Sequence, residues 1–587
     1  AALSTIDRFW LDEFADLVEL EAALRSGADV VARAYECGYS TAGIEQLGGT
    51  PVDALPAAFR MVDTAAAEFP ARSPYYYLSR GEADEMRTGD KESVVVVGSG
   101  PIRIGQGIEF DYSCVHAAWA LRGAGRAAVI VNNNPETVST DFDVSDTLIF
   151  EPPGADEVEA AYRATDALGV MLAFGGQTAI NLAAELSRRN VPIVGSDRAS
   201  LDMAEDREQF EAALQRLGVA RPQGRAARSF RDARQIARTL GFPVLVRPSF
   251  VLGGRGMEIV YNEGQLASYA ESAPPIQPGA PLLVDKYLPG LEIEVDAVYD
   301  GTDILIPGIF EHIERAGIHS GDSIGVYPPR SLDPAMETRI VEVTTAIARE
   351  LKIRGLINIQ FVLHDGAPYI IEANPRASRT IPIIQKATGI NLVAAATRIA
   401  LGERLADMEY GTGLRPRVPF TVVKVPVFSF SKMRGVETIL GPEMKSTGEV
   451  LGIDATFAGA LLKGFTAAGV RLPGSGGRIL VSMRGDDDAQ AADVLARYRD
   501  LGHTLIETSG AAALELIARR EVDLVINDAS GPRELTDNYR IRRAAVEAGI
   551  ACLTSLDTAR ALAEALAGSA GPPRSLQLYQ AEIPPPR

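Results

Sequence analysis

Residues 358–380 read NIQFVLHDGAPYIIEANPRASRT, in which two apolar strand patterns flank a glycine turn and a proline follows the second strand. This pattern predicts a β-hairpin. Glu372 and Asn374 lie two positions apart in the second strand, so their side chains point to the same face, and Pro375 stops strand pairing just after them. The sequence therefore predicts a strand end where a carboxylate and an amide lie side by side.

The register of this hairpin depends on its turn. With a two-residue turn, Gln360 would lie opposite Ile371 and Glu372 would lie on the other face. With a three-residue loop whose glycine has a positive φ, Gln360 lies opposite Glu372 and Asn358 opposite Asn374. We predict the second register, which gathers Gln360, Glu372 and Asn374 on one face. It leaves four apolar residues to the core: Phe361, Leu363, Tyr369 and Ile371.

The polar residues of this segment match the chemistry of a metal–phosphate site. Hard cations such as Mg²⁺ take oxygen ligands and usually keep substrate phosphates in their shell. Arg376 and Arg379 follow directly, and arginine binds anionic oxygens through its planar fork of donors. These residues alone leave a second interpretation open, a strand end that carries a solvated cluster of salt bridges.

Length, composition and charge exclude several classes of protein. A chain of 587 residues is too long for one core and predicts roughly three to five domains. No apolar run approaches the roughly 20 residues of a membrane span, and the first residues show no signal-peptide pattern. The three cysteines are far apart, which favours a reducing compartment, and a formal charge of −19 opposes binding to nucleic acid. We therefore expect a cytoplasmic protein that binds neither membrane nor nucleic acid.

The pattern along the chain changes several times. Residues 1–90 show helical spacing, with a polar linker at residues 81–92. Beyond the linker, buried strand patterns alternate with helices as in a doubly wound α/β sheet, and from about Glu205 longer strands and hairpins predict an α+β region. A glycine-rich linker at residues 472–477 precedes a third α/β unit that starts near Arg478. The expected fold class is a multidomain α/β and α+β protein.

Three further segments contain candidate anion-binding residues. RPSFVLGGR, residues 247–255, places one arginine at a strand end and a second on a glycine loop, which predicts a phosphate lid. GSGPIRIGQG, residues 98–107, lacks the dinucleotide spacing and is either an anion-binding loop or a tight turn. EHIERAGIHSGD, residues 311–322, has two histidines but no thiol nearby, which disfavours zinc and favours an anion-binding loop.

Several motifs together resemble one family. The series GQGIEFDYSCVHAAWAL, NNNPETVSTDFD, FGGQTAINLA, AEDREQF, RPSFVLGGRGMEIVY, EHIERAGIHSGDS, IEANPRASRT and LGPEMKSTGEV resembles the C-terminal half of the large subunit of carbamoyl phosphate synthetase, from about Thr5 to the C-terminus. The resemblance implies the tail of a helical oligomerisation domain at residues 1–90 and a pre-ATP-grasp domain at 93–204. It also implies an ATP-grasp domain that phosphorylates carbamate at 205–475, and a shortened regulatory domain similar to methylglyoxal synthase at 478–587.

The resemblance also assigns an activity and individual residues. The implied reaction is phosphorylation of carbamate by ATP, a step of pyrimidine and arginine synthesis, with a pair of Mg²⁺ or Mn²⁺ ions at the site and K⁺ as a further cation. Arg376 and Arg379 would hold the transferred phosphoryl group or the carbamate, and the metal ligands would be Gln360, Glu372 and Asn374. The implied ATP-binding residues are Arg247 and Arg255 on the phosphates, Lys286, Leu288 and Glu292 on the adenosine, and Gly317, Ile318, His319 and Ser320 around the nucleotide.

The family resemblance further implies partners. These are the N-terminal half of the large subunit, which phosphorylates bicarbonate and is absent from this chain, and a glutaminase small subunit in glutamine-hydrolysing rather than ammonia-dependent forms. An oligomer is also implied. Two alternatives stay open: another ATP-grasp carboxylate–amine ligase, such as biotin carboxylase, and a non-catalytic assembly or regulatory module.

The regulatory segment departs from the family pattern. Only one helix is predicted between the ETSG turn and the strand VDLVIND, and Ala511 stands where a threonine is usual, so the binding of a nucleotide effector is not expected. Glu314, Asp322 and Glu443 keep the acidic pattern that the family associates with ornithine.

Overall fold

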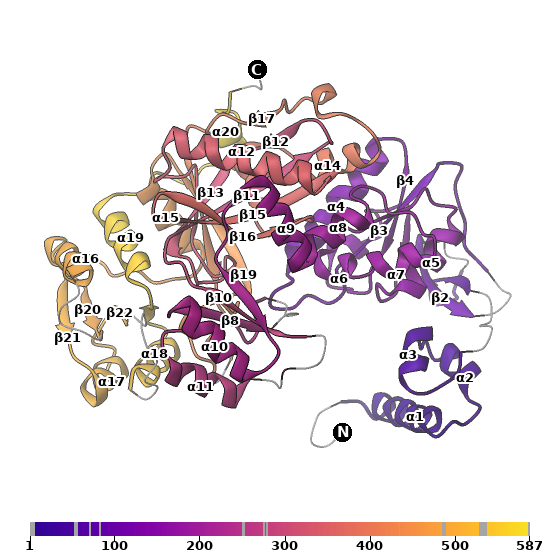
Figure 1. Ribbon diagram of the computed structural model, residues 1–587, viewed down its shortest axis with the longest axis horizontal. Helices are drawn as coiled ribbons and strands as arrows, with labels where there is room; N and C mark the ends of the chain where they lie inside the picture. The colour runs from indigo at the N-terminus through magenta and orange to yellow at the C-terminus, as the bar shows by residue number, and fades with distance from the viewer. Residues whose placement is uncertain are drawn as a thin grey trace. The chain divides into compact units, whose positions relative to one another are not determined.

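The computed structural model describes residues 6–51, 57–69, 72–80, 84–248, 253–273, 276, 280–433, 435–483, 489–527 and 537–584 (Figure 1). The chain forms two compact units. The first unit contains residues 1–102 and 110–198, and the second contains residues 103–109 and 199–587.

The first unit is built on a six-stranded sheet. Its strands, in spatial order, are β1 (Ala57–Met61), β2 (Tyr75–Arg80), β5 (Thr147–Ile149), β4 (Ala127–Val131), β3 (Ser93–Val97) and β6 (Val170–Met171). All neighbouring strands are parallel except β1 and β2, and α5 (Ala155–Ala164) packs against β3 and β4. This is the doubly wound sheet that the alternating pattern predicts.

The helical expectation for residues 1–90 is correct only in part. The segment begins with helices α1 (Arg8–Arg25), α2 (Val31–Glu36) and α3 (Thr41–Gln46), but β1 and β2 are strands of the sheet. The expectation is wrong for residues 57–80 because aromatic side chains there, Phe59 and Tyr76, are buried as parts of strands. The short strands AAFRM and YYYLSR carry too few residues to show a clear alternation. The other helices of this unit are α4 (Ile108–Gly123), which begins in the second unit, α6 (Gly176–Ile180) and α7 (Ala183–Arg188).

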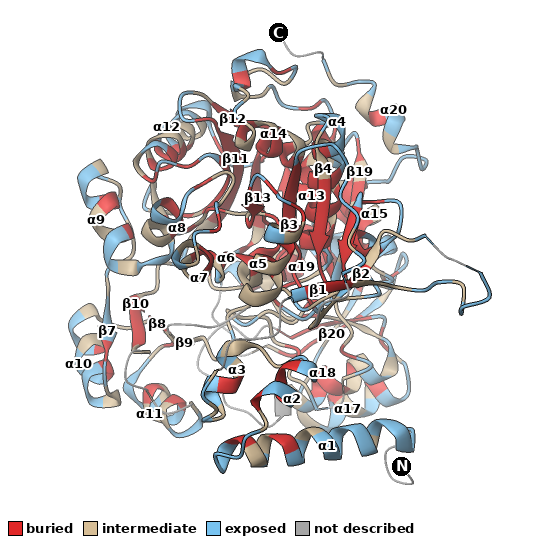
Figure 2. Ribbon diagram, turned by 90° about the vertical axis from the view of Figure 1, so that its right-hand side faces the viewer, coloured by how far each residue is buried: buried red, intermediate tan, exposed pale blue. Residues whose placement is uncertain are grey.

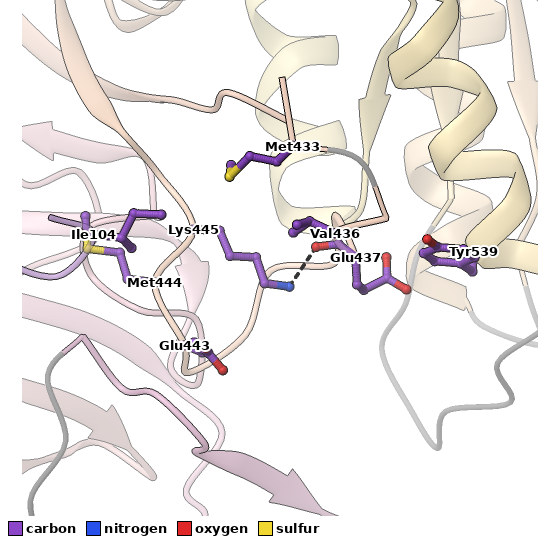
Figure 3. A pocket seen from close by; sticks show the side chains of 8 residues that line it. All are labelled: Ile104, Met433, Val436, Glu437, Glu443, Met444, Lys445 and Tyr539. Atoms are coloured by element: carbon purple, nitrogen blue, oxygen red, sulfur yellow. Dashed lines mark hydrogen bonds between the residues drawn. The ribbon is translucent and has the colours of Figure 1, made fainter. Parts of the chain in front are cut away.

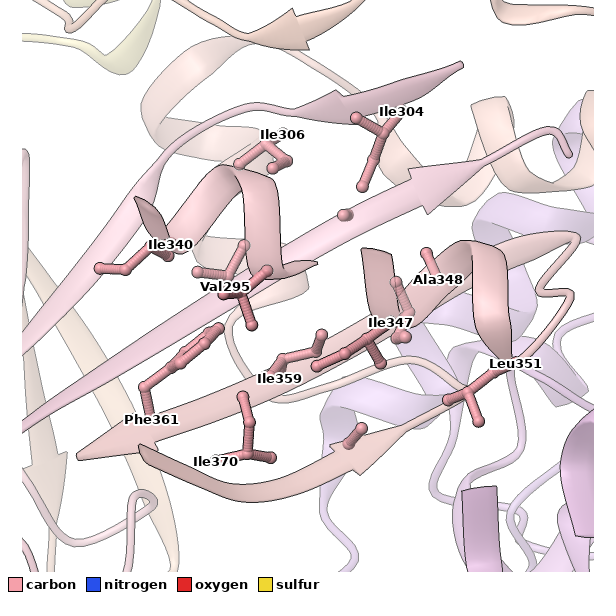
Figure 4. Close-up of a cluster of buried hydrophobic side chains, with 14 of the residues drawn as sticks. Val295, Ile304, Ile306, Ile340, Ile347, Ala348, Leu351, Ile359, Phe361 and Ile370 are labelled. Carbon is pink, nitrogen blue, oxygen red and sulfur yellow. The ribbon is translucent and has the colours of Figure 1, made fainter. Parts of the chain in front are cut away.

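A nine-stranded sheet forms the centre of the second unit. Its main path is β16 (Ala367–Asn374), β15 (Gly355–His364), β11 (Leu291–Tyr299), β13 (Ile309–Arg315), β14 (Gly325–Tyr327), β18 (Thr421–Val427) and β19 (Gly448–Asp454), and β12 (Ile304–Ile306) joins β11 to β17 (Gly413–Leu414). Helix α12 (Pro334–Glu350) buries Ile340, Ile347 and their neighbours against β11, β15 and β16 (Figure 4). Figure 2 shows buried residues concentrated in these strands.

A smaller antiparallel sheet in the same unit carries a second group of predicted site residues. Its strand order is β7 (Gly224–Ala227), β10 (Leu282–Lys286), β8 (Val244–Pro248) and β9 (Glu258–Val260). Helices α10 (Phe230–Leu240) and α11 (Glu263–Ser272) share its core. The remaining helices of this part of the chain are α8 (Arg198–Glu205), α9 (Arg207–Leu217), α13 (Ile381–Thr388), α14 (Leu392–Ala400) and α15 (Phe457–Ala467).

The C-terminal segment forms a four-stranded parallel sheet. Its order is β21 (Thr504–Glu507), β20 (Arg478–Val481), β22 (Leu524–Ile526) and β23 (Ala551–Leu553), with α16 (Ala489–Asp500), α17 (Gly510–Ala518), α18 (Asp537–Ala548) and α19 (Leu556–Ala567) after successive strands and α20 (Leu576–Gln580) last. This confirms the predicted order of four strands, each followed by a helix. Residues of β18, α15, β20, β22 and α19 belong to one continuous hydrophobic core.

No helix in the described part of the chain is both long and apolar enough to cross a membrane.

Candidate active site

The hairpin of β15 and β16 has the predicted pairs, although its turn is not the predicted one. Asn358 lies opposite Asn374 and Gln360 opposite Glu372, as expected. The turn, however, has two residues, because His364 pairs directly with Ala367 and both intervening residues have positive φ. A β-bulge next to Gln360 adds one residue to the second strand and restores the predicted pairs.

The bulge also changes which residues of β16 are buried. Ile370 is buried, whereas Ile371, which we predicted to be in the core, is exposed. Phe361 is fully buried as predicted, and Leu363 packs against the same core. The prediction for Ile371 is wrong because the extra residue of the bulge shifts, by one position, which side chains of β16 face the core.

The three predicted metal ligands lie together at the end of the hairpin. Asn374 Nδ2 donates to Glu372 Oε1 at 3.0 Å, and Gln360 Nε2 donates to Ser320 Oγ at 3.2 Å. Glu372 is exposed, and Gln360 and Asn374 are half-buried. The group presents one carboxylate and two side-chain amides at a surface that solvent reaches.

The turn after β16 carries the two predicted arginines, of which Arg376 contacts one of these ligands. Arg376 Nη2 donates to Asn374 Oδ1 at 3.2 Å, and burial lowers the pKa of Arg376. Arg379 forms an ion pair with Glu109, with 3.2 Å between Nε and Oε1, and donates to the carbonyl of Gly105 at 2.8 Å. The glycine loop predicted as an anion loop or a tight turn therefore contacts the arginine turn.

The predicted nucleotide loop, residues 317–320, is held from both sides. His319 N donates to the carbonyl of Gly441 at 2.8 Å, and the buried Lys424 donates to the carbonyl of Ser320 at 2.6 Å. Gly317 has a φ of +106°, and a Cβ atom there would lie 2.6 Å from Ile259 Cδ1. The backbone angle therefore favours glycine at this position, and any larger residue would also displace the end of the Ile259 side chain. The preceding carbonyl, that of Ala316, accepts from the hydroxyl of Tyr287 at 2.6 Å.

Arg247 belongs to a cluster of three arginines on the smaller sheet. Arg207 donates to Asp285 at 2.6 Å, and Arg247 and Arg221 approach the same carboxylate at 3.4 and 3.9 Å. Burial and the neighbouring Arg207 lower the pKa of Arg221. Buried nitrogen atoms of Arg207 and Arg247, Nη1 and Nε respectively, have no hydrogen-bond partner. Arg247 Nε still faces Asp285 as an ion pair, so the feature of the cluster that suits a phosphate is its surplus of positive charge.

Sequence reasoning missed Arg207 and Arg221. Arg207 begins α9 and Arg221 lies just before β7, so neither is near Arg247 in the sequence. Only the fold brings the three side chains to Asp285, and no local motif marks them.

The other predicted ATP-binding residues do not form one cluster with Arg247. Arg255 is exposed in the glycine loop, and residues 249–252 of the predicted phosphate lid lie outside the described residues. Lys286 donates to the carbonyls of Gly241 and Phe242 at 2.9 and 3.1 Å, and Leu288 is half-buried after β10. Burial, together with the nearby carboxylates of Glu294 and Glu372, raises the pKa of Glu292 to about 7.

All three carboxylates of the ornithine pattern accept hydrogen bonds from other residues of this chain. Glu314 accepts from Thr558 Oγ1 at 2.6 Å and from the Ile324 amide at 2.7 Å. Asp322 accepts from the Lys445 and Ser446 amides, each at 2.8 Å, and Glu443 accepts from the Gly256 amide at 3.3 Å.

A cavity of about 560 Å³ lies beside Glu443 (Figure 3). Most of its lining is apolar, and the hydrogen bond from Lys445 Nζ to the Glu437 carbonyl, 3.0 Å long, lies in its wall. The lining residues are Ile104, Met433, Val436, Glu437, Glu443, Met444, Lys445 and Tyr539.

Among the residues that the structure describes, no three His, Cys, Asp or Glu side chains form a metal-binding group. The hairpin offers a different donor set, one carboxylate and two amides, all oxygen donors on adjacent cross-strand pairs. These three side chains alone would not complete the coordination of a cation. They fit Mg²⁺, which keeps waters and substrate phosphates in its coordination shell. The side chains that would hold Mg²⁺ are Gln360, Glu372 and Asn374.

Two family models match the chain. Residues 90–203 match the carbamoyl phosphate synthase preATP-grasp domain, and residues 206–408 match the carbamoyl-phosphate synthase L chain, ATP binding domain. The fold is accordingly a mixed α/β ATP-grasp fold with a pre-ATP-grasp domain, and the chain falls in the ATP-grasp ligase superfamily. More particularly, it is an ATP-grasp protein like the carbamoyl-phosphate synthase L chain.

Solved structures with a similar fold include other ATP-grasp enzymes. An ADP complex of N5-carboxyaminoimidazole ribonucleotide synthetase is 15% identical, covers 65% of this chain and 96% of its own, and has a TM-score of 0.51. Biotin carboxylase from Campylobacter jejuni, in a beta-gamma-ATP complex, is 19% identical over 57% of this chain and 76% of its own, with a TM-score of 0.47. The biotin carboxylase domain of Hydrogenobacter thermophilus 2-oxoglutarate carboxylase, solved with MgADP and bicarbonate, is 19% identical over 58% and 76%, with a TM-score of 0.47.

Proposed function

We propose that the chain phosphorylates carbamate with MgATP to form carbamoyl phosphate. The observation that carries this proposal is the end of the β15–β16 hairpin, where three oxygen ligands lie beside Arg376 within a segment that matches the ATP-binding domain of the carbamoyl-phosphate synthase L chain. In the pathway this step would serve pyrimidine and arginine synthesis.

The reaction requires charge neutralisation rather than a protein nucleophile. A carbamate oxygen attacks the γ-phosphorus of ATP, the bond from that phosphorus to the bridging oxygen breaks, and ADP leaves. Mg²⁺ or Mn²⁺ at Gln360, Glu372 and Asn374 would offset the phosphate charge. Arg376 and Arg379 hold the transferred phosphoryl group or the carbamate, and their fixed positive charges stabilise the transition state.

We assign the nucleotide to residues of both sheets. Arg247 and Arg255 bind phosphates, with Arg207 and Arg221 contributing to the positive charge around Arg247. Lys286, Leu288 and Glu292 contact the adenosine, and residues 317–320 line its pocket. The buried Lys424 supports this loop because it binds the Ser320 carbonyl.

The proposed domain roles and partners follow the same resemblance. Residues 93–204 and 205–475 act as the pre-ATP-grasp and ATP-grasp domains, residues 478–587 as a shortened regulatory domain, and residues 1–90 as part of an oligomerisation domain. The partners are a protein or segment that phosphorylates bicarbonate and a glutaminase that supplies ammonia. K⁺ is a further proposed cation.

A substrate screen tests the proposal. The purified chain is given MgATP and ADP release is measured with ammonium carbamate, with bicarbonate and biotin, and with bicarbonate and aminoimidazole ribonucleotide. We expect ADP release above background only with carbamate. Release that depends on biotin or on the ribonucleotide would assign the chain to another ATP-grasp ligase, and no release with any acceptor would favour a non-catalytic module.

A further inference from the structure

Five buried polar side chains form a hydrogen-bonded group beneath the arginine turn. Glu294 and Asp296 lie on β11, Asn358 lies on β15, and Ser378 and Thr380 lie after β16. Each is at most 6% exposed. We call these five residues the acidic brace.

The brace connects both carboxylates of β11 to the turn. Asn358 Nδ2 donates to Glu294 Oε1 and to Asp296 Oδ1, at 2.9 Å in each case. Ser378 Oγ donates to Asp296 Oδ1 at 2.7 Å, and Thr380 Oγ1 donates to Glu294 Oε1 at 3.0 Å and contacts Asp296 Oδ2. The turn that carries Arg376 and Arg379 is therefore attached to the middle of β11.

Thr380 does not have the local role that its position suggests. It is the N-cap residue of α13, where a threonine hydroxyl commonly accepts a hydrogen bond from the first turn of the helix. Here the hydroxyl makes no capping bond and is directed to Glu294 and Asp296 instead. The side chain therefore secures the turn to β11 rather than beginning the helix.

The brace also reaches the metal ligands. Asn358 lies opposite Asn374 in the hairpin, and Asn374 Nδ2 approaches Asn358 Oδ1 at 3.5 Å. The acidic brace thus supports both Asn374, one of the proposed metal ligands, and the turn that carries Arg376 and Arg379.

We propose that Thr380 is a positioning residue for phosphoryl transfer: its hydroxyl, held by Glu294 and Asp296, fixes the turn so that Arg376 and Arg379 meet the transferred phosphoryl group. This inference rests on the proposed function. Since Thr380 is buried and its hydroxyl is directed to Glu294 and Asp296, its effect passes through the arginines. A displacement of about 1 Å at such a site costs up to about 100-fold in rate.

If Thr380 acts in this way, its loss should affect kcat but not nucleotide binding. Arg247 and Lys286, two of the residues assigned to the nucleotide, lie on the smaller sheet, which the brace does not include. Glu292 shares β11 with Glu294 and Asp296, but Thr380 contacts only the latter two. Loss of the Thr380 hydroxyl should lower kcat while the KM and the dissociation constant for MgADP stay close to the wild-type values.

The test compares Thr380→Val with Thr380→Ser. Valine keeps the shape and removes the hydroxyl, and serine keeps the hydroxyl. Thr388→Val is the matched control, because Thr388 is a buried threonine at the other end of α13. Its hydroxyl donates to the Ile384 carbonyl at 2.6 Å and accepts from the Ile390 amide at 3.3 Å, so its contacts lie outside the brace. ATP formation from carbamoyl phosphate and MgADP gives kcat and KM, calorimetry gives MgADP affinity, and thermal unfolding reports the folded state.

We expect Thr380→Val to lower kcat about 10-fold to 100-fold with unchanged MgADP affinity, and Thr380→Ser to recover most of the activity. Wild-type kcat in Thr380→Val, equal losses in the valine and serine variants, or a loss confined to KM would overturn the inference. If Thr380→Val does not fold, Ser378→Ala replaces it with the same expected split between kcat and KM. A wild-type chain without activity would instead refute the proposed function itself.

Discussion

Replacing Glu372 by glutamine tests the metal assignment, because it removes one negative charge from the hairpin without changing its size. Glu372 is exposed, and its only described side-chain hydrogen bond is the one that it accepts from Asn374. The substitution should change the free energy of unfolding by no more than about 0.5 kcal/mol. Its effect on catalysis should be much larger.

The expected catalytic loss follows from the donor set. Glu372 is the only carboxylate among the three proposed ligands, so Glu372→Gln would leave a cation there with neutral protein ligands alone. We expect phosphoryl transfer to fall at least about 100-fold, which corresponds to about 2.7 kcal/mol in activation free energy, and the Mg²⁺ concentration at half-maximal rate to rise.

The matched control is Asp365→Asn, at the turn of the same hairpin. The Asp365 side chain is 88% exposed, and asparagine tolerates its positive φ of 48°. Both variants are assayed for ATP formation from carbamoyl phosphate and MgADP over a range of Mg²⁺ concentrations. Near-normal turnover of Glu372→Gln at limiting Mg²⁺, or an equal loss in Asp365→Asn, would refute the metal assignment.

Three other predictions concern stability, nucleotide binding and regulation. Arg542 is 4% exposed and donates to both oxygens of Glu437, so Glu437→Gln should lower the free energy of unfolding by about 3 kcal/mol or more, measured in urea. Burial raises the pKa of Glu437, but Arg542 has the larger effect and lowers the pKa below its usual value. The stabilisation from this ion pair should therefore be present above about pH 4.5 and be lost as the pH falls further. The variant should show no such stabilisation at any pH. Arg247→Met should raise the KM for MgADP about tenfold or more by steady-state kinetics, and an unchanged KM would exclude Arg247 from the phosphate site. Activity should not respond to a uridine nucleotide, because α17 alone connects β21 to β22 and offers no additional basic strand; a saturable activity change in a titration would contradict this.

The hairpin shows both the reach and the limit of sequence reasoning. The pairs that place Gln360 opposite Glu372 are correct, but they arise from a two-residue turn and a bulge rather than from a three-residue loop. The two arrangements place Glu372 identically and differ at Ile371, which is exposed. Alternation of apolar residues cannot reveal the bulge, because both isoleucines suit a strand and only packing against the sheet selects Ile370 for the core.

Other features of the fold could be predicted only where a short segment of sequence determines them. The four strands from residue 478 onward were predictable because each is a short apolar run followed by a helical pattern. The strands β1 and β2 were not, since both are too short to show a clear alternation and β2 joins the sheet through β5, which lies far along the chain. The arginine cluster at Asp285 and the acidic brace depend on contacts between distant elements, so no spacing of residues indicates them.

The most direct test of the account is a ³¹P NMR measurement on the purified chain with carbamoyl phosphate and MgADP. We expect the β- and γ-phosphate resonances of ATP to grow as that of carbamoyl phosphate declines, beyond its spontaneous breakdown, and Glu372→Gln to suppress this growth. Conversion of carbamoyl phosphate to inorganic phosphate alone, with no ATP at any Mg²⁺ concentration, would contradict the central claim that this site transfers a phosphoryl group between carbamate and ADP.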